Sequence, residues 1–184
     1  MAPYHHLLAH MPIALLSVAF LIILLRFFSA GELARRLDSV LLYALVLGIG
    51  VGLLTLIVGM LIWPIDAATT SPMGRNKILI SGWMLACWVA VLFLRWRGGE
   101  SVWDSAPRYA MLGFGALGGI LLATTGTLGG HLLGSPSGLT ALFRKIGWDV
   151  YHTYYAPSWV LAVLAAVGVA GLVIGLLGTR KTAS

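Results

Sequence analysis

Five histidines are the residues of this chain best suited to chemistry: His5, His6, His10, His131 and His152. Histidine is the commonest metal ligand among side chains and can also hold the iron of a haem. His6 and His10 are four residues apart and therefore share one face of a helix, while His5 lies about 100° away around that helix. The other two are distant in sequence, so the elements around them decide whether the five can act together.

The apolar character of the chain indicates that these elements are membrane-spanning helices. Of its 184 residues, 59% are hydrophobic and only 10% are charged, and the mean hydropathy is +0.94. A soluble domain of this length needs a more charged surface, and a spanning helix needs roughly 20 mostly apolar residues. Runs of this kind predict one all-α membrane bundle over 1–184, with about five spans: 5–28, 39–65, 77–96, 108–133 and 150–177.

The alternation of these spans places all five histidines on one side of the membrane, at the start of the first span, the end of the fourth and the start of the fifth. It also places four Lys and Arg on that side and eight on the other. Short loops rich in Lys and Arg remain in the cytoplasm, so we expect the N-terminus outside and the C-terminus inside. We interpret the segment 29–38 as an interfacial turn or amphipathic helix.

A haem wedged between helices would give the histidines a common function. We predict His10 and His131 as its axial ligands, because they are the deepest of the five and come from different helices; His6 with His152 is the second choice, or would hold a second haem. The fourth span is rich in glycines, including Gly126 and Gly130, that leave room for a flat ring. Cationic residues on the same side, Arg75 and Lys77 among them, could pair with the haem propionates.

Other interpretations of the same residues remain open. Histidines at helix ends, His5 above all, can simply sit at the interface with their polar tips in water. The glycines form pairs spaced as GxxxG, which pack helices together without any cofactor. The histidines could instead hold copper or another metal ion.

Several classes of function are excluded. The chain has no P-loop, no nucleophile elbow, no zinc-protease motif and no dinucleotide fingerprint. Its single cysteine, Cys87, excludes an intrachain disulfide and covalent haem attachment through CxxCH. The positive charge lies in short loops, where it sets topology and contacts anionic lipid rather than nucleic acid.

Two stretches carry a family resemblance: His5-x-x-x-x-His10-Met11-Pro12-Ile13-Ala14-Leu15 and Thr125-Gly126-Thr127-Leu128-Gly129-Gly130. They resemble a bacterial integral-membrane family of unknown function, the DUF2231 type, whose first helix opens with a histidine followed by HFPIAL and whose later helix carries TGxxGG. The resemblance implies a bacterial inner membrane and a haem or redox association, with His5 and His10 as more than interfacial residues. The sequence differs from the family pattern at His6, at His131 and at Asn76-Lys77.

These observations lead to one main hypothesis and two alternatives. The main hypothesis is a b-type haem subunit with one haem or two. It would carry electrons between a quinone pool and a periplasmic redox partner, and it could bind the quinone itself. Because the chain has no other catalytic apparatus, we expect it to work within a larger membrane complex. The alternatives are a cofactor-free structural or assembly subunit and a copper-handling or other metal-handling membrane protein.

Overall fold

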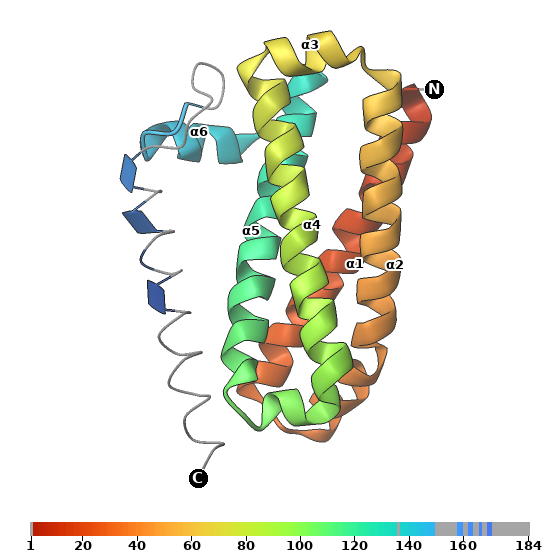
Figure 1. Ribbon diagram of the computed structural model, residues 1–184, viewed down its shortest axis with the longest axis vertical. Coiled ribbons are helices and arrows are strands. Elements are labelled where there is room, and N and C mark those ends of the chain that lie inside the picture. The colour runs from red at the N-terminus through yellow and green to blue at the C-terminus, as the bar shows by residue number, and fades with distance from the viewer. Residues whose placement is uncertain are drawn as a thin grey trace.

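The computed structural model describes residues 2–135 and 137–149, together with 158–159, 162–163, 166 and 169–170. Four helices in this part are long and apolar enough to cross a membrane: α1 (Ala2–Phe28), α2 (Glu32–Ile62), α4 (Pro72–Gly98) and α5 (Pro107–Leu132) (Figure 1). Three short helices connect or follow them: α3 (Ile65–Thr70), the 3-10 helix η1 (Gly99–Trp103) and α6 (Gly138–Lys145). The predicted all-α membrane bundle is confirmed, and its fifth span, 150–177, lies almost wholly outside the described residues.

Prolines and polar caps set the helix ends where the sequence indicates them. Pro64 follows the end of α2, because a proline cannot continue the hydrogen bonding of a helix. Pro72 and Pro107 occupy the first turns of α4 and α5, where their missing N–H is tolerated. The Ser71 hydroxyl accepts a hydrogen bond of 2.9 Å from the Gly74 N–H and so caps α4.

The second span begins earlier than predicted. Only Ser29, Ala30 and Gly31 separate α1 from α2, and the residues from Glu32 onward are helical. The segment 29–38 is therefore mostly the first two turns of a spanning helix rather than a separate interfacial element. The reason is that this part of α2 turns Ala34 and Asp38 into the bundle, where both are buried.

The four long helices form a ring. α1 packs most extensively against α2 and α4 against α5, and the ring closes through smaller contacts of α1 with α5 and of α2 with α4. We call one end of this ring the histidine end: the start of α1, α3, the start of α4, the end of α5 and α6, all in the upper part of Figure 1. The arginine end comprises the end of α1, the start of α2, the end of α4, η1 and the start of α5.

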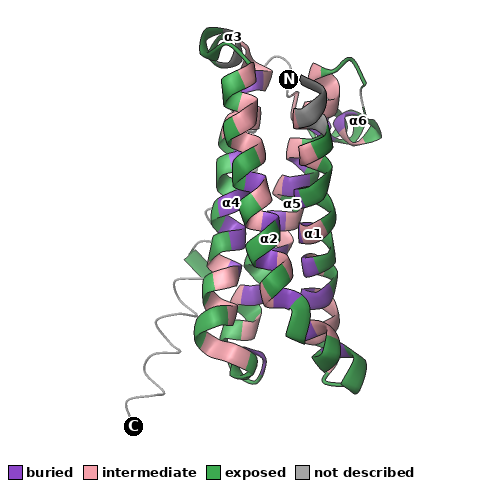
Figure 2. Cartoon of the chain, turned by 90° about the vertical axis from the view of Figure 1, so that its right-hand side faces the viewer, coloured by how far each residue is buried: buried purple, intermediate pink, exposed green. Residues whose placement is uncertain are grey.

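Large side chains of one helix fit against glycines of the next, and buried residues line the inward faces (Figure 2). Leu16 of α1 lies against Gly48 of α2, where an added Cβ would come within 2.7 Å of Leu16 Cδ2. Trp88 of α4 is fully buried against Gly118 of α5, at 2.9 Å from the position of an added Cβ. Close backbone approach at small residues is the usual way in which membrane helices associate.

Candidate functional site

Three of the predicted site histidines have described side chains, and all three lie at the histidine end. The ring of His5 packs against Gly59 near the end of α2, where an added Cβ would meet His5 Cε1 at 2.7 Å. His10 lies farther along α1 and is exposed. His131 is near the end of α5 and is partly buried. The side chains of His6 and His152 lie outside the described residues.

His131 faces α6 rather than α1. Its Nε2 contacts the Thr140 hydroxyl of α6, and the Ser137 hydroxyl, next to α6, donates a hydrogen bond of 3.2 Å to the Thr127 hydroxyl of α5. Thr127 and Thr140 are both buried. This group of polar side chains joins the end of α5 to α6, and Phe143 packs beside it against Ile80 and Leu128.

The predicted ligands His10 and His131 point in different directions. α1 meets α5 at Ile13 and Gly126, where Ile13 Cδ1 would lie 3.8 Å from an added Cβ. His131 is five residues beyond Gly126, which turns it about 140° around α5 from that contact. His10 is about 60° around α1 from Ile13 and is exposed. The structure thus brings the two histidines to the same end of the bundle but not onto facing sides of α1 and α5.

The predicted cationic residues lie at this end as well. Lys77 reaches across from α4 to α5, with its Nζ 3.4 Å from the position of an added Cβ on Gly129. The Arg75 side chain donates a hydrogen bond to the carbonyl oxygen of Thr69 in α3 and is exposed. Gly130 lies under the carbonyl oxygen of Ser135, at 2.8 Å from an added Cβ, so it permits a tight chain reversal after α5.

The glycines in the middle of α5 are occupied by side chains of neighbouring helices, whereas Gly126, nearer the histidine end, has only Ile13 Cδ1 at 3.8 Å from an added Cβ. Gly115 receives Ile23, Gly118 receives Trp88 and Gly119 receives Phe20. The interior of the bundle at this depth is therefore a packed apolar core, with Leu16, Leu45, Met111 and Leu122 among its other members. A porphyrin does not fit there without displacing these residues.

No group of three or more His, Cys, Asp or Glu side chains that could hold a metal ion occurs among the described residues. Such a group is what a protein-bound copper or zinc ion typically needs. A haem with two axial ligands needs only two imidazoles, so the same observation does not bear on haem.

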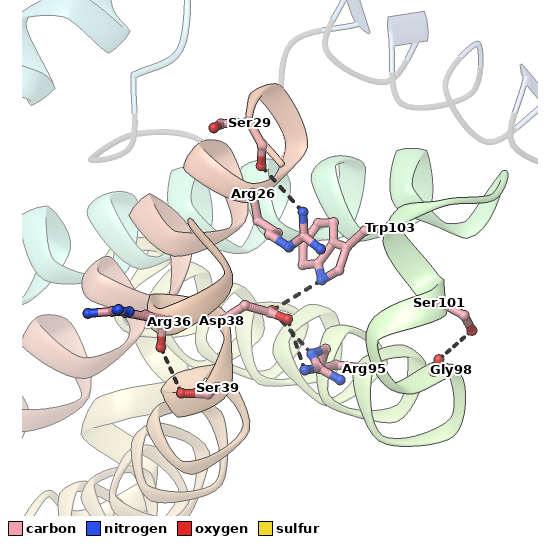
Figure 3. Close-up of polar contacts among 9 residues, drawn as sticks. All are labelled: Arg26, Ser29, Arg36, Asp38, Ser39, Arg95, Gly98, Ser101 and Trp103. Atoms are coloured by element: carbon pink, nitrogen blue, oxygen red, sulfur yellow. Dashed lines mark hydrogen bonds and ion pairs between the residues drawn. The ribbon is translucent and has the colours of Figure 1, made fainter. Parts of the chain in front are cut away.

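The arginine end holds a buried ionic cluster that the sequence analysis did not predict. Asp38 of α2, only 1% exposed, accepts hydrogen bonds from Arg95 of α4: Nε to Oδ1 at 3.2 Å and Nη2 to Oδ2 at 2.9 Å. The indole N–H of Trp103 in η1 donates to Oδ1 at 3.1 Å. The guanidinium of Arg26 in α1 lies over the Trp103 ring, 5.9 Å from its centroid (Figure 3).

A sequence signal for this cluster existed. Asp38 stands next to the apolar run that begins at Val40, and Arg95 lies between Leu94 and Trp96. Ionisable residues inside apolar runs face the bundle interior and pair with each other. The pairing of Asp38 with Arg95 was not predicted, because Asp38 was placed in an interfacial turn and Arg95 was counted among the charges that set topology.

Comparisons with protein-family models, with curated proteins and with solved structures find no match to this chain. The resemblance to the DUF2231 type therefore stays a prediction based on the two stretches in α1 and α5.

Proposed function

We propose that this chain is a non-catalytic structural or assembly subunit of a larger membrane complex. The observation that carries the proposal is the packed interior: Trp88, Ile23 and Phe20 occupy the glycine surfaces in the middle of α5. The ionic cluster of Asp38 and Arg95 supports it, because a buried pair joined by two hydrogen bonds between α2 and α4 fixes these helices relative to each other.

A b-type haem subunit is the second candidate, and the composition of the histidine end favours it. His5, His10 and His131 gather there with the cations Arg75 and Lys77. A bound haem would supply one-electron transfer between a quinone and a redox partner. The chain's residues would provide imidazole ligands and cations for the propionates.

The ligand directions determine which pair to test in that case. His131 faces α6, and His152 follows α6 closely in the sequence. His131 and His152 are therefore a further candidate pair of axial ligands. They are tested beside the two predicted pairs, His10 with His131 and His6 with His152. His6 and His10 stand on one helix face and cannot bind opposite sides of one iron.

One preparation separates the two functions. The full chain is purified with its partners from native membranes in mild detergent, and the same sample is analysed for co-purifying proteins and by pyridine haemochrome spectrum. We expect partner proteins in stoichiometric amounts. We expect no haem signal in the spectrum that depends on the histidines.

The spectrum would overturn this assignment if it showed about one haem per chain. In that case, the variants His10→Ala, His131→Ala and His152→Ala identify the ligands, because loss of an axial imidazole leaves high-spin haem or none. Recovery of the chain as a monomer without partners and without haem would contradict both functions.

A further inference from the structure

The short helix α6 is placed differently from the four long helices. It lies outside their ring and runs crosswise to α4 and α5 at the histidine end (Figure 1). Its eight residues, Gly138–Lys145, begin shortly after the end of α5, which is long and apolar enough to cross a membrane. Because the end of a spanning helix marks the level of the bilayer surface, α6 lies at that level and beside the bundle.

Two contacts fix how α6 is rotated about its own axis. Thr140 contacts His131, which is next to the last residue of α5. Phe143 packs against Ile80 and Leu128. Leu128 precedes His131 by three residues and therefore lies about 4.5 Å deeper along α5. A rotation around α6 from Thr140 to Phe143 is thus a rotation from the bilayer surface toward the bilayer interior.

The apolar side chains of α6 follow in the same sense of rotation. Leu139, Ile146 and Leu142 come about 40°, 60° and 100° beyond Phe143 around the helix. Leu142 is 51% exposed and Ile146 is 42% exposed. These two side chains therefore point into the membrane beside the bundle, where the protein itself leaves them uncovered.

The opposite side of α6 is cationic. Arg144 and Lys145 lie about 40° and 140° from Thr140 in the other sense of rotation, and both are exposed. An apolar face opposite a face with Lys and Arg is typical of helices that lie in the plane of a bilayer surface. A long cationic side chain at this level can reach the headgroups while its stem stays along apolar surface.

Two tryptophans at the end of α6 support the same level. The rings of Trp148 and Phe143 pack with their centroids 5.1 Å apart. The indole N–H of Trp159 donates a hydrogen bond of 2.9 Å to the carbonyl oxygen of Ile146. Tryptophan is enriched where the headgroups of a bilayer meet its hydrocarbon, so these contacts are those expected of a helix end at the membrane interface.

We propose that α6 is an interfacial helix that binds a bilayer surface containing anionic lipid. Leu142 and Ile146 enter the hydrocarbon, and Arg144 and Lys145 contact the phosphate groups of the lipid. Positive charge on the face turned away from the hydrocarbon is what favours an anionic headgroup over a zwitterionic one. This surface is independent of any cofactor or partner subunit.

The bilayer would hold a helix that the protein holds only weakly. Within α6, only Thr140 and Phe143 are buried. Thr140 also contacts His131, so a lipid surface that fixes α6 fixes the partner of this histidine as well.

The test measures the depth of α6 in the full-length protein, reconstituted into vesicles of phosphatidylcholine and phosphatidylglycerol. A nitrobenzoxadiazole label is attached through Leu142→Cys or, as the matched control, through Ala141→Cys, both combined with Cys87→Ala. Ala141 is exposed like Leu142 but lies about 100° around α6 from it, on the cationic side. We expect lipid with a nitroxide in its acyl chain to quench the label at position 142 more strongly, and aqueous iodide to quench the label at position 141 more strongly.

A second arm tests the anionic headgroup. Phosphatidylglycerol and phosphatidylcholine, each with a nitroxide in the acyl chain, are compared at equal mole fraction as quenchers of the label at position 142. We expect phosphatidylglycerol to quench more strongly. Lys145→Gln should weaken this preference by up to about fivefold, since one Lys near an anionic surface contributes about 1 kcal/mol. Arg97→Gln removes the same charge from an exposed residue at the arginine end and should leave the preference unchanged.

Three outcomes would overturn the proposal. Equal quenching of the two labels by iodide would mean that α6 stands clear of the bilayer. Protection of the label at position 142 from both quenchers would mean that protein, and not lipid, covers the apolar face. Equal quenching by the two lipids, or equal effects of Lys145→Gln and Arg97→Gln, would exclude the contacts with anionic headgroups. Should Leu142→Cys fail to fold, Ile146→Cys takes its place and should show the same quenching by lipid.

Discussion

Replacing Asp38 with asparagine tests how strongly the ionic cluster holds the arginine end together. The change keeps the shape of the side chain and one acceptor oxygen, but it removes the charge and turns an amide NH2 toward a guanidinium or an indole N–H. Arg95, whose side chain is 12% exposed, would keep its charge in a buried position without a counter-ion. Trp103 is 4% exposed and competes with Arg95 for the one remaining acceptor.

The expected loss of stability follows from these contacts. Removing one partner of a buried ion pair costs about 3–5 kcal/mol. Because the Arg95 side chain keeps some contact with solvent, we expect Asp38→Asn to lose about 3 kcal/mol of stability, at the lower end of that range. The double variant Asp38→Asn with Arg95→Gln leaves no isolated charge, so its loss should be smaller than the sum of the two single losses by about 2 kcal/mol, within the usual range for residues in contact.

Unfolding in mixed micelles with increasing dodecyl sulfate, followed by helical circular dichroism, measures these free energies. Glu32→Gln is the control, because Glu32 also pairs with arginines but is exposed, and we expect no measurable change from it. A loss below about 1 kcal/mol for Asp38→Asn would refute the reasoning. So would a double variant whose loss equals the sum, since the two residues would then act independently.

Three further predictions test the packing and the topology. Gly118→Ala should destabilise the bundle by about 1–3 kcal/mol, because the new Cβ would meet Trp88. Gly113→Ala, where an added Cβ has nothing within 4 Å, should be neutral or stabilise the bundle by up to about 1 kcal/mol. Comparable losses of stability for both variants would contradict the packing argument. Cys87 is free and only 5% exposed, so a maleimide should label it only after unfolding in dodecyl sulfate, and fast labelling of the folded protein would mean that this face of α4 is open. Reporters fused after Gly134 and after Ser184 should be active on opposite sides of the membrane, with the second in the cytoplasm; activity on one side for both would exclude the fifth span.

The helices were predictable because each depends on a local property of the sequence. Apolar runs of spanning length define α1, α2, α4 and α5, and Pro72 and Pro107 stand within one turn of the helix starts that they favour. The start of α2 was not predictable in the same way. Glu32, Arg35 and Arg36 make its first turns look like a surface segment, and only the burial of Asp38 against Arg95 shows that the helix continues through them.

The histidines show the limit of prediction from topology. Alternation of spans correctly gathers His5, His10 and His131 at one end, because it depends only on the number of crossings. The direction in which each side chain points depends on the rotation of its helix about the helix axis. That rotation is set by packing elsewhere, such as Ile13 on Gly126 and Trp88 on Gly118, and no pattern near the histidines reveals it. The contact of His131 with Thr140 also depends on α6, a short helix that lies between the predicted spans 108–133 and 150–177.

The two ends of the bundle differ in what their polar groups contact, and this difference indicates where a partner or cofactor could act. At the arginine end the buried carboxylate of Asp38 makes three hydrogen bonds to groups that lie on different helices, so moving any one helix would break some of them. At the histidine end the polar contacts of α5 go to α6, a helix of only eight residues, and His10 is exposed. Displacing α6 would cost little packing, since only Phe143 and Thr140 of that helix are buried. A ligand or a neighbouring subunit can therefore rearrange the histidine end without disturbing the ring of long helices, whereas the arginine end keeps that ring together.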